Sequence, residues 1–296
     1  MLWSFWINRR AMTNSLHLIS HAKVNLRLEI LGRREDGYHK LRTVFQKISL
    51  HDTLYFSLKK EKGILITADH PKLPLGRKNL VYKAIQSVFK RCGFAGGVDV
   101  KIEKRIPLGA GLGGGSSNAA TALVALNRLL KLDLSQKELM GMGLEIGADV
   151  PFFFLRGAAI GSGIGERLKT EELPSLGYVL IYPNFEVSTR WAYQHFELTN
   201  QRFHINLQRF LRTPEGISGI LLNHLEGVVS RKYPQIDLMK KLLLSAGALG
   251  SLMTGSGPTV FGLFPDAESA SKGYEKIRRS AGREGWSAFK AHGIAT

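Results

Sequence analysis

The chain has 296 residues, of which 44% are hydrophobic and 22% charged, with a formal net charge of +17 and a single cysteine. This composition is typical of a globular protein with room for two domains or one large one. It excludes a disulfide framework and a cysteine zinc site, and no stretch reaches the roughly 18 apolar residues of a transmembrane helix.

The positive charge is spread along the sequence, and no basic run is longer than three residues. Such dispersion indicates a solvated cationic surface rather than a nucleic-acid module. We therefore expect no nucleic-acid partner. The lack of a transmembrane stretch predicts no membrane partner, and the single cysteine, Cys92, fits a reducing, cytoplasmic location. The start of the chain differs from a secretory signal, because Arg9 and Arg10 follow its apolar part. We expect residues 1–19 to form a disordered leader, or a misassigned one with the true start at Met12, and the alternative is a tail that touches a membrane.

The first hundred residues are predicted to contain mainly strands. Residues 22–30 alternate between apolar and polar types, which predicts a half-buried strand with Lys23 and Asn25 on its polar face. An Asp-Gly turn signal opens the segment Asp36–His39. Further strands are expected at residues 41–48, 53–58, 64–67 and 98–103.

The most unusual segment of the sequence covers residues 107–118. Five of the seven residues 109–115 are glycine, and a loop this rich in glycine loses much backbone entropy on folding. Such a loop is useful where a ligand must touch bare backbone, and Ser116-Ser117-Asn118 is expected to cap a helix over residues 119–130. Free N–H groups and the dipole at a helix start favour an anion, so we predict that this loop binds phosphate.

Two commoner phosphate-binding motifs fit this loop poorly. A Walker loop needs a lysine directly after its last glycine, and none follows here. The Rossmann pattern is nearly matched by Gly109, Gly111 and Gly114, but its setting at the first strand of a βαβ unit is missing. The remaining alternative is a tight turn that only packs a helix on a strand, which rarely needs five glycines.

Capping signals place helices on both sides of the glycine-rich loop, after Asn79 and after Ser135. The second half of the chain is predicted to contain a strand at 178–182, a helix capped at Ser188-Thr189, helices over 217–229, 234–245 and 267–280, and a loop of small residues within 253–264. Strands and helices mix without regular βαβ alternation, so the expected class is α+β. We place the two domains at residues 1–165 and 166–296.

Phosphoryl transfer needs a cradle for the phosphates, a metal to neutralise them, a base, and a cation near the transferred group. Asp149 and Lys23 are candidates for the base and the cation. Each has a simpler explanation. Asp149 precedes Val150-Pro151 and is suited to cap a short helix, and a lysine on the polar face of a strand is usually solvated. The residues by themselves do not show that the two side chains meet.

Three blocks in this order, Ala22–Leu26, Pro107–Ser117 and Thr254–Pro258, resemble the three motifs of the GHMP small-molecule kinases. Asp36–His39 and Gly147–Phe153 are further similar to the members that phosphorylate the 2-hydroxyl of 4-diphosphocytidyl-2-C-methyl-D-erythritol in the non-mevalonate isoprenoid pathway. The resemblance covers nearly the whole chain after the leader. It implies a ribosomal-protein-S5-like N-terminal domain and a ferredoxin-like C-terminal domain, with the active site in the cleft between them.

The resemblance also implies roles for individual residues. Asp149 would take the proton of the acceptor hydroxyl, and Lys23 would stabilise that hydroxyl or the moving phosphoryl group. The ATP-binding residues would be Pro107, Leu108, Gly109, Ala110, Gly111, Leu112, Gly113, Gly114, Gly115, Ser116 and Ser117, with Asn79 and Lys104 near the adenosine. The substrate-binding residues would be Asn25, Tyr38, His39, Thr189, Tyr193, Gly255, Ser256 and Gly257, with His39 reading the cytosine edge.

Magnesium is expected to bind mainly through the ATP phosphates, and no protein ligand for it is assigned beyond Ser117 as a candidate hydroxyl. The protein is expected to be a monomer or a weak homodimer. Two alternatives remain open. One is a kinase for another small alcohol, such as homoserine or mevalonate, against which the Tyr38-His39 pair argues because those alcohols carry no cytosine. The other is a non-catalytic nucleotide- or RNA-binding protein, suggested by the charge of +17.

Overall fold

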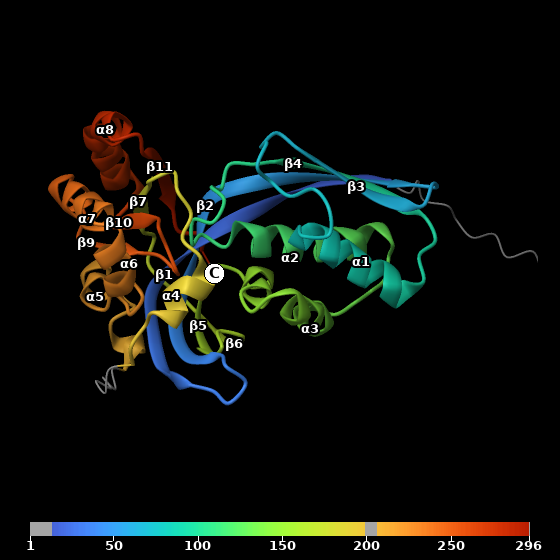
Figure 1. Ribbon diagram of the computed structural model, residues 1–296, viewed down its shortest axis with the longest axis horizontal. Helices are drawn as coiled ribbons and strands as arrows, with labels where there is room; N and C mark the ends of the chain where they lie inside the picture. The colour runs from blue at the N-terminus through green and yellow to red at the C-terminus, as the bar shows by residue number, and fades with distance from the viewer. Residues whose placement is uncertain (1–13, 199–205, 296) are drawn as a thin grey trace, which may run out of the picture.

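The computed structural model describes residues 14–198 and 206–295, which form two sheets with helices packed on them (Figure 1). The first sheet is built on two long antiparallel strands, β1 (Ser15–Arg33) and β2 (His39–Lys59). β2 joins the two strands predicted at 41–48 and 53–58 into one. The ladder between β1 and β2 is interrupted by irregularities, one of them next to His21, so the break that the sequence suggested is a distortion within a continuous strand.

The leader prediction is wrong for residues 14–19, because β1 begins at Ser15. The side chains of Leu16 and Leu18 pack against the hydrophobic core under the first sheet. Residues 1–13, the rest of the predicted leader, lie outside the described part of the chain.

Five shorter strands extend the first sheet: β3 (Gly63–Ala68), β4 (Gly97–Glu103), β5 (Ala158–Gly163), β6 (Arg167–Glu171) and β8 (Leu222–Asn223). The strand order is β3-β4-β2-β1-β8, and β5 pairs with both β2 and β6. Helices α1 (Leu80–Cys92), α2 (Gly114–Leu129) and α3 (Gln136–Ile146) cover one face of the sheet (Figure 1). β6 lies beyond residue 165 and still pairs with β5 of this sheet. The boundary between two domains at residues 165 and 166 stays a prediction.

The predicted caps of α1 and α3 are confirmed. The Asn79 side chain accepts a hydrogen bond from the backbone N–H of Val81 at the start of α1, and Gly93 ends that helix with a φ of 64°. Ser135 and Glu138 form both bonds of a capping box at the start of α3. These signals involve neighbours within three residues, so they can be recognised without knowledge of the fold.

The second sheet has the order β11-β7-β10-β9, formed by β7 (Gly177–Tyr182), β9 (Gly250–Met253), β10 (Val260–Phe264) and β11 (Ser287–His292). Its helices are α4 (Thr189–Gln194), α5 (Pro214–Gly219), α6 (Glu226–Lys232), α7 (Gln235–Ser245) and α8 (Ala267–Arg283). The predicted α+β class is confirmed, although the sequence did not predict β11. The expected cap is confirmed at Ser188, whose side chain accepts from the N–H of Trp191.

The continuous helix expected at 217–229 is wrong. The chain forms two short helices, α5 and α6, with β8 between them. In β8, the buried side chain of Asn223 makes hydrogen bonds to other segments. The Asn223 amide donates to the carbonyls of Met253 and Gly255 at 2.7 and 2.8 Å, and its oxygen accepts from the N–H of Leu225. The two carbonyls lie about thirty residues away, so periodicity could not reveal them.

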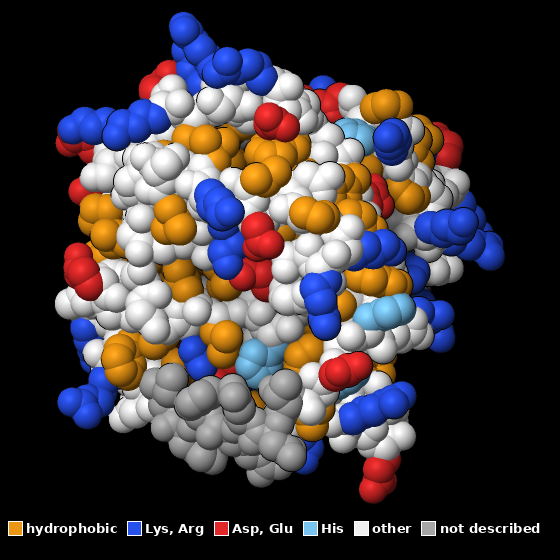
Figure 2. Space-filling view, turned by 60° about the vertical axis from the view of Figure 1, so that its left-hand side comes forward, with side chains coloured by type: hydrophobic (Ala, Val, Ile, Leu, Met, Phe, Trp, Pro, Cys, Tyr) orange, Lys and Arg blue, Asp and Glu red, His pale blue; other side chains and the backbone are white. Residues whose placement is uncertain are grey.

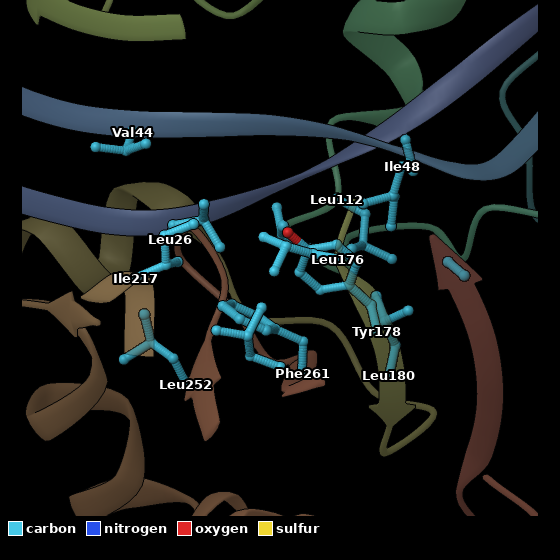
Figure 3. Packing of buried hydrophobic residues seen from close by; sticks show 14 of the residues in the cluster. Leu26, Val44, Ile48, Leu112, Leu176, Tyr178, Leu180, Ile217, Leu252 and Phe261 are labelled. Carbon is cyan, nitrogen blue, oxygen red and sulfur yellow. The ribbon is translucent and has the colours of Figure 1, made fainter. Parts of the chain in front are cut away.

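A shared hydrophobic core joins the two sheets. Leu26, Val44 and Ile48 point from β1 and β2 toward Leu180 and Phe261 of the second sheet (Figure 3). On the face in Figure 2, lysine and arginine side chains are scattered among acidic and apolar ones.

The prediction of a half-buried strand at 22–30 is wrong, because β1 is covered on both faces. The polar residues Lys23, Asn25 and Arg27 expose only 2 to 3% of their surface. The glycine-rich loop lies on one side of this strand, where the backbone N–H of Lys23 donates to the carbonyl of Leu112 at 3.0 Å. Alternating polarity therefore marks a face that meets a polar site, not solvent.

Asp52, a fully buried residue of β2, fixes the start of the glycine-rich loop. One carboxylate oxygen accepts from the backbone N–H groups of Arg105 and Ile106, both at 2.8 Å. The other accepts from the Lys104 ammonium at 2.8 Å and from the Asn118 amide at 3.0 Å. Four donors, three from the segment that joins β4 to the glycine-rich loop and one from α2, thus converge on one carboxylate.

We expect Asp52→Asn to lower the free energy of unfolding by about 3 kcal/mol, because it leaves the Lys104 ammonium buried without its counter-ion. Urea denaturation measures this change. Asp99→Asn is the control, since Asp99 also pairs with a lysine but is half exposed, and its loss should leave stability nearly unchanged. Equal effects of the two substitutions would contradict the role given to Asp52.

Candidate active site

A cavity of about 1160 Å³ opens between β1, the glycine-rich loop, α4 and the loop after β9. It brings together most of the predicted site residues: Lys23, Asn25, Tyr38, His39, Asn79, Lys104, Pro107, Leu108, Gly109, Ala110, Gly111, Leu112, Gly113, Gly114, Gly115, Ser116, Asp149, Thr189, Tyr193, Gly255 and Ser256. Ser117 and Gly257 do not line it. The Ser117 hydroxyl instead accepts from the Ser20 hydroxyl at 2.7 Å beneath the loop.

Lys23 and Asp149 meet in this cavity, with the Lys23 Nζ 3.7 Å from a carboxylate oxygen of Asp149. The ammonium also donates to Asn25 Oδ1 at 2.5 Å and lies 5.6 Å from the centre of the Phe45 ring. Burial lowers the pKa of Lys23, and the neighbouring Asp149 opposes that shift. The solvated lysine of the simpler explanation is therefore wrong, because only 4% of this side chain is exposed.

The capping explanation for Asp149 is wrong as well. Asp149 occupies the position before the short 3-10 helix η1 (Val150–Phe154), but its side chain makes no capping hydrogen bond. The carboxylate is 39% exposed and directed toward Lys23. It is therefore free to act on a molecule in the cavity.

The glycine-rich loop starts α2 earlier than expected. α2 begins at Gly114, after Gly113 with a φ of 70°, so Ser116-Ser117-Asn118 lies in the first turn, and the prediction that it caps the helix is wrong. A side chain at position 113 would come within 2.8 Å of the Phe153 ring. The first N–H groups of a helix have no partner within it, so the start of α2 presents backbone donors beside the cavity.

The loop after β9 packs directly on the glycine-rich loop. A Cβ added to Gly111, whose φ is 78°, would lie 2.3 Å from the carbonyl oxygen of Thr254. The Thr254 hydroxyl accepts from the backbone N–H of Asn25 at 2.9 Å. One end of this loop also reaches α4, where the hydroxyls of Ser256 and Thr189 are 2.8 Å apart. Three distant segments of the chain therefore share one wall.

Aromatic side chains line the other end of the cavity. The rings of His39 and Tyr193 lie 5.2 Å apart, while Tyr38 is 60% exposed. Burial and the nearby Arg33 lower the pKa of His39, which favours its neutral form at pH 7. A neutral imidazole offers one donor and one acceptor, a pair suited to the edge of a nucleobase.

Several residues of the site were missed in the sequence. Thr43 accepts from the Asn25 amide at 2.8 Å, and Asp52 holds the loop from below. Phe196 lines the cavity and stacks on His224. No local pattern marks these side chains, since each contact joins residues at least 18 positions apart.

Within residues 14–198 and 206–295, no three His, Cys, Asp or Glu side chains form a group that could hold a metal ion. The helices in that part of the chain also include none that is long and apolar enough to span a membrane.

Family models match both halves of the chain. One described as the GHMP kinases N terminal domain matches residues 79–157, and one described as GHMP kinases C terminal matches residues 207–283. A 4-diphosphocytidyl-2-C-methyl-D-erythritol kinase of Syntrophotalea carbinolica is 45% identical over 92% of this chain and 96% of its own length. One from Syntrophus aciditrophicus is 45% identical over 87% and 92%, respectively.

Solved structures agree with these relatives. The crystal structure of a 4-(cytidine 5'-diphospho)-2C-methyl-D-erythritol kinase has a TM-score of 0.81 at 34% identity, covering 95% of this chain and 100% of that one. A homoserine kinase from Cytophaga hutchinsonii has a TM-score of 0.74 at 22% identity over 97% and 96%, which shows a shared fold. The chain therefore belongs to the GHMP kinase family, and within it to the group of the 4-diphosphocytidyl-2-C-methyl-D-erythritol kinases.

Proposed function

We propose that this kinase transfers the γ-phosphoryl group of ATP to the 2-hydroxyl of 4-diphosphocytidyl-2-C-methyl-D-erythritol, a step of the non-mevalonate isoprenoid pathway. The observation that carries the proposal is one cavity lined at one end by the glycine-rich loop and at the other by His39 and Tyr193, with Lys23 and Asp149 in contact. Family membership supports the reaction class.

The reaction divides between the two charged side chains. Asp149 accepts the proton of the substrate 2-hydroxyl while the oxygen of that hydroxyl forms a bond to the γ-phosphorus of ATP. The bond between the γ-phosphorus and the bridging oxygen of the β-phosphate breaks, which releases ADP. The Lys23 ammonium stabilises the negative charge of the attacking oxygen or of the moving phosphoryl group. Its burial makes this charge more effective, because little water screens it.

The glycine-rich loop suits the phosphates of ATP. Its glycines leave bare backbone where a Cβ would collide, and the start of α2 directs N–H groups toward an anion. Mg²⁺ would arrive with these phosphates and neutralise their charge. Ser117 fits a metal poorly, because its hydroxyl accepts a hydrogen bond from Ser20 and does not line the cavity.

The aromatic end suits the cytidine. The His39 ring would hydrogen-bond the cytosine edge, and Tyr193 and Tyr38 offer faces for stacking. Asn25, Thr189 and Ser256 line the wall between this end and the glycine-rich loop, where the substrate diphosphate and hydroxyl would lie. The cytoplasmic location and the monomer or weak homodimer stay predictions.

The proposed function is tested by ADP release from Mg-ATP in the presence of 4-diphosphocytidyl-2-C-methyl-D-erythritol. We expect release that depends on this substrate, with homoserine and mevalonate as controls that give none. Release with a control alcohol alone would keep the kinase and reject the cytidine pocket. If no alcohol elicits ADP, the kinase proposal fails and nucleotide or RNA binding becomes the hypothesis to test.

We expect Asp149→Asn to lower kcat by about 10² to 10⁴-fold, the usual contribution of a general base. Its free energy of unfolding should fall by less than that of Asp52→Asn, because Asp149 is 39% exposed and its ion pair with Lys23 spans 3.7 Å. Steady-state kinetics and urea denaturation measure the two effects. Glu145→Gln is the control, because Glu145 is an exposed carboxylate on the preceding helix α3. Near-normal turnover of the Asp149 variant would remove it as the base.

We expect Gly111→Ala to raise the KM for ATP by at least about tenfold, because the new methyl group would push the two loops apart at a φ of 78°. Gly141→Ala is the control, since Gly141 lies within α3 and an added methyl group there would meet no neighbouring atom within 4 Å. An unchanged KM in the Gly111 variant would show that contact between the loops does not shape the nucleotide site.

A further inference from the structure

Lys47 is a buried lysine of β2 that the proposed reaction does not use. It is 8% exposed and lies directly opposite Lys23 in the register of β1 and β2. In the described part of the chain, its ammonium is bonded to carbonyl oxygens and forms no ion pair with a carboxylate. Like charges on opposed strand positions destabilise a sheet, so both lysines need compensating partners.

The partners of Lys47 lie on the segment that follows Asp149. The Lys47 Nζ donates to the carbonyls of Phe153 and Leu155 at 3.1 and 2.5 Å, and it lies 5.8 Å from the centre of the Phe152 ring. These carbonyls are at the C-terminal end of η1, where a cation is favoured by the free oxygens and by the local dipole. The backbone N–H of Lys47 also donates to the carbonyl of Gly157 at 2.9 Å.

Lys47 is itself firmly held. Its carbonyl accepts from the backbone N–H of Ile294 at 2.9 Å and from the Gln46 amide at 2.7 Å. Burial lowers the pKa of Lys47 to about 8, so at pH 7 most of the side chain remains an ammonium. A fixed cation therefore stands at the end of η1.

The two opposed lysines contact opposite ends of η1. Lys23 meets Asp149 just before the helix, and Lys47 binds the carbonyls where it ends. Between them, the Phe152 ring stacks on Phe45 at 4.8 Å, and Phe153 fills the space beside Gly113. A shift of η1 would therefore move the Asp149 carboxylate and the start of α2 together.

The Asp149 side chain has few contacts that fix its position, although η1 itself packs on α2 and α3. Its side chain makes no capping bond, and its contact with Lys23 is a 3.7 Å ion pair. We propose that Lys47 is a positioning residue for phosphoryl transfer, which holds η1 by two carbonyls and so places Asp149 against Lys23. The proposal rests on the proposed function for its kinetic part, while the anchoring of η1 can be tested without any reaction.

The test compares Lys47→Met and Lys47→Arg. Methionine keeps the apolar stem and removes the donors, whereas arginine keeps a cation that can reach carbonyls. We expect Lys47→Met to lower kcat by roughly 10 to 100-fold, the scale of an ångström-sized misplacement, with the KM for ATP changed by less than about threefold. Lys47→Arg should recover most of the turnover. Lys101→Met is the control, because Lys101 is an exposed lysine of the same sheet.

Hydrogen–deuterium exchange gives the second measurement. We expect faster exchange at the amides of Val150 and Leu155 in Lys47→Met, because these N–H groups donate to the carbonyls of Gly147 and Phe152 at the two ends of η1. Exchange in Lys47→Arg should equal that of the wild type. Wild-type kcat and exchange in the methionine variant would overturn the proposal. A loss of kcat that Lys47→Arg does not restore would also overturn it. So would a loss of kcat no larger than the loss of folded protein, as measured by ATP binding.

The two proposals can fail separately. If the wild-type protein releases no ADP with the cytidine substrate, the proposed function fails. The anchoring of η1 by Lys47 is then judged by exchange alone, and unchanged exchange of residues 149–155 in Lys47→Met would reject it. If the wild-type protein is active and the methionine variant equals it, the function stands and the role of Lys47 is rejected.

Discussion

The Lys23 ammonium has to remain charged while it is enclosed by protein, and much of the active site follows from this constraint. A buried charge is costly unless it is paired and hydrogen-bonded. Its partners here come from three places: Asn25 on the same strand, Asp149 from the turn before η1, and the Phe45 ring from β2. The pair can therefore form only when the sheet and η1 have already assembled.

The glycine-rich loop meets the opposite requirement, a site for negative charge built from neutral backbone. Its entry is fixed by the Asp52 carboxylate, and its far side is pressed against the carbonyl of Thr254. The donors at the start of α2 are therefore oriented before any ligand arrives. Electrostatic groups that need no reorganisation during the reaction are the most effective ones in catalysis.

The sequence predicted the features that depend on near neighbours. The cap at Asn79, the capping box at Ser135 and the position of the glycine-rich loop all follow from residues a few positions apart. The resemblance supplied the pairing of Lys23 with Asp149, which the residues alone left open. Local reasoning failed where distant partners decide the structure.

Two cases show why. Asn223 breaks an expected helix because its amide bonds carbonyls about thirty residues away. Gly113 has the left-handed φ of 70° before α2, at a position where the Phe153 ring leaves no room for a Cβ. The burial of Asp52 and Lys47 likewise needs groups from the segment after β4, from α2 and from η1. Composition and periodicity carry no record of such contacts.

The great length of β1 and β2 has a consequence for access to the cavity. These strands of 19 and 21 residues pack against helices α1 to α3 along one part and against the second sheet along another, and they share an almost continuous ladder (Figure 1). Bending either strand sharply would break many hydrogen bonds at once, so the strands give a stiff support on which the second sheet packs through the shared hydrophobic core. We therefore expect the cavity to open by movement of the short loops that line it, around Tyr38 and Ser256.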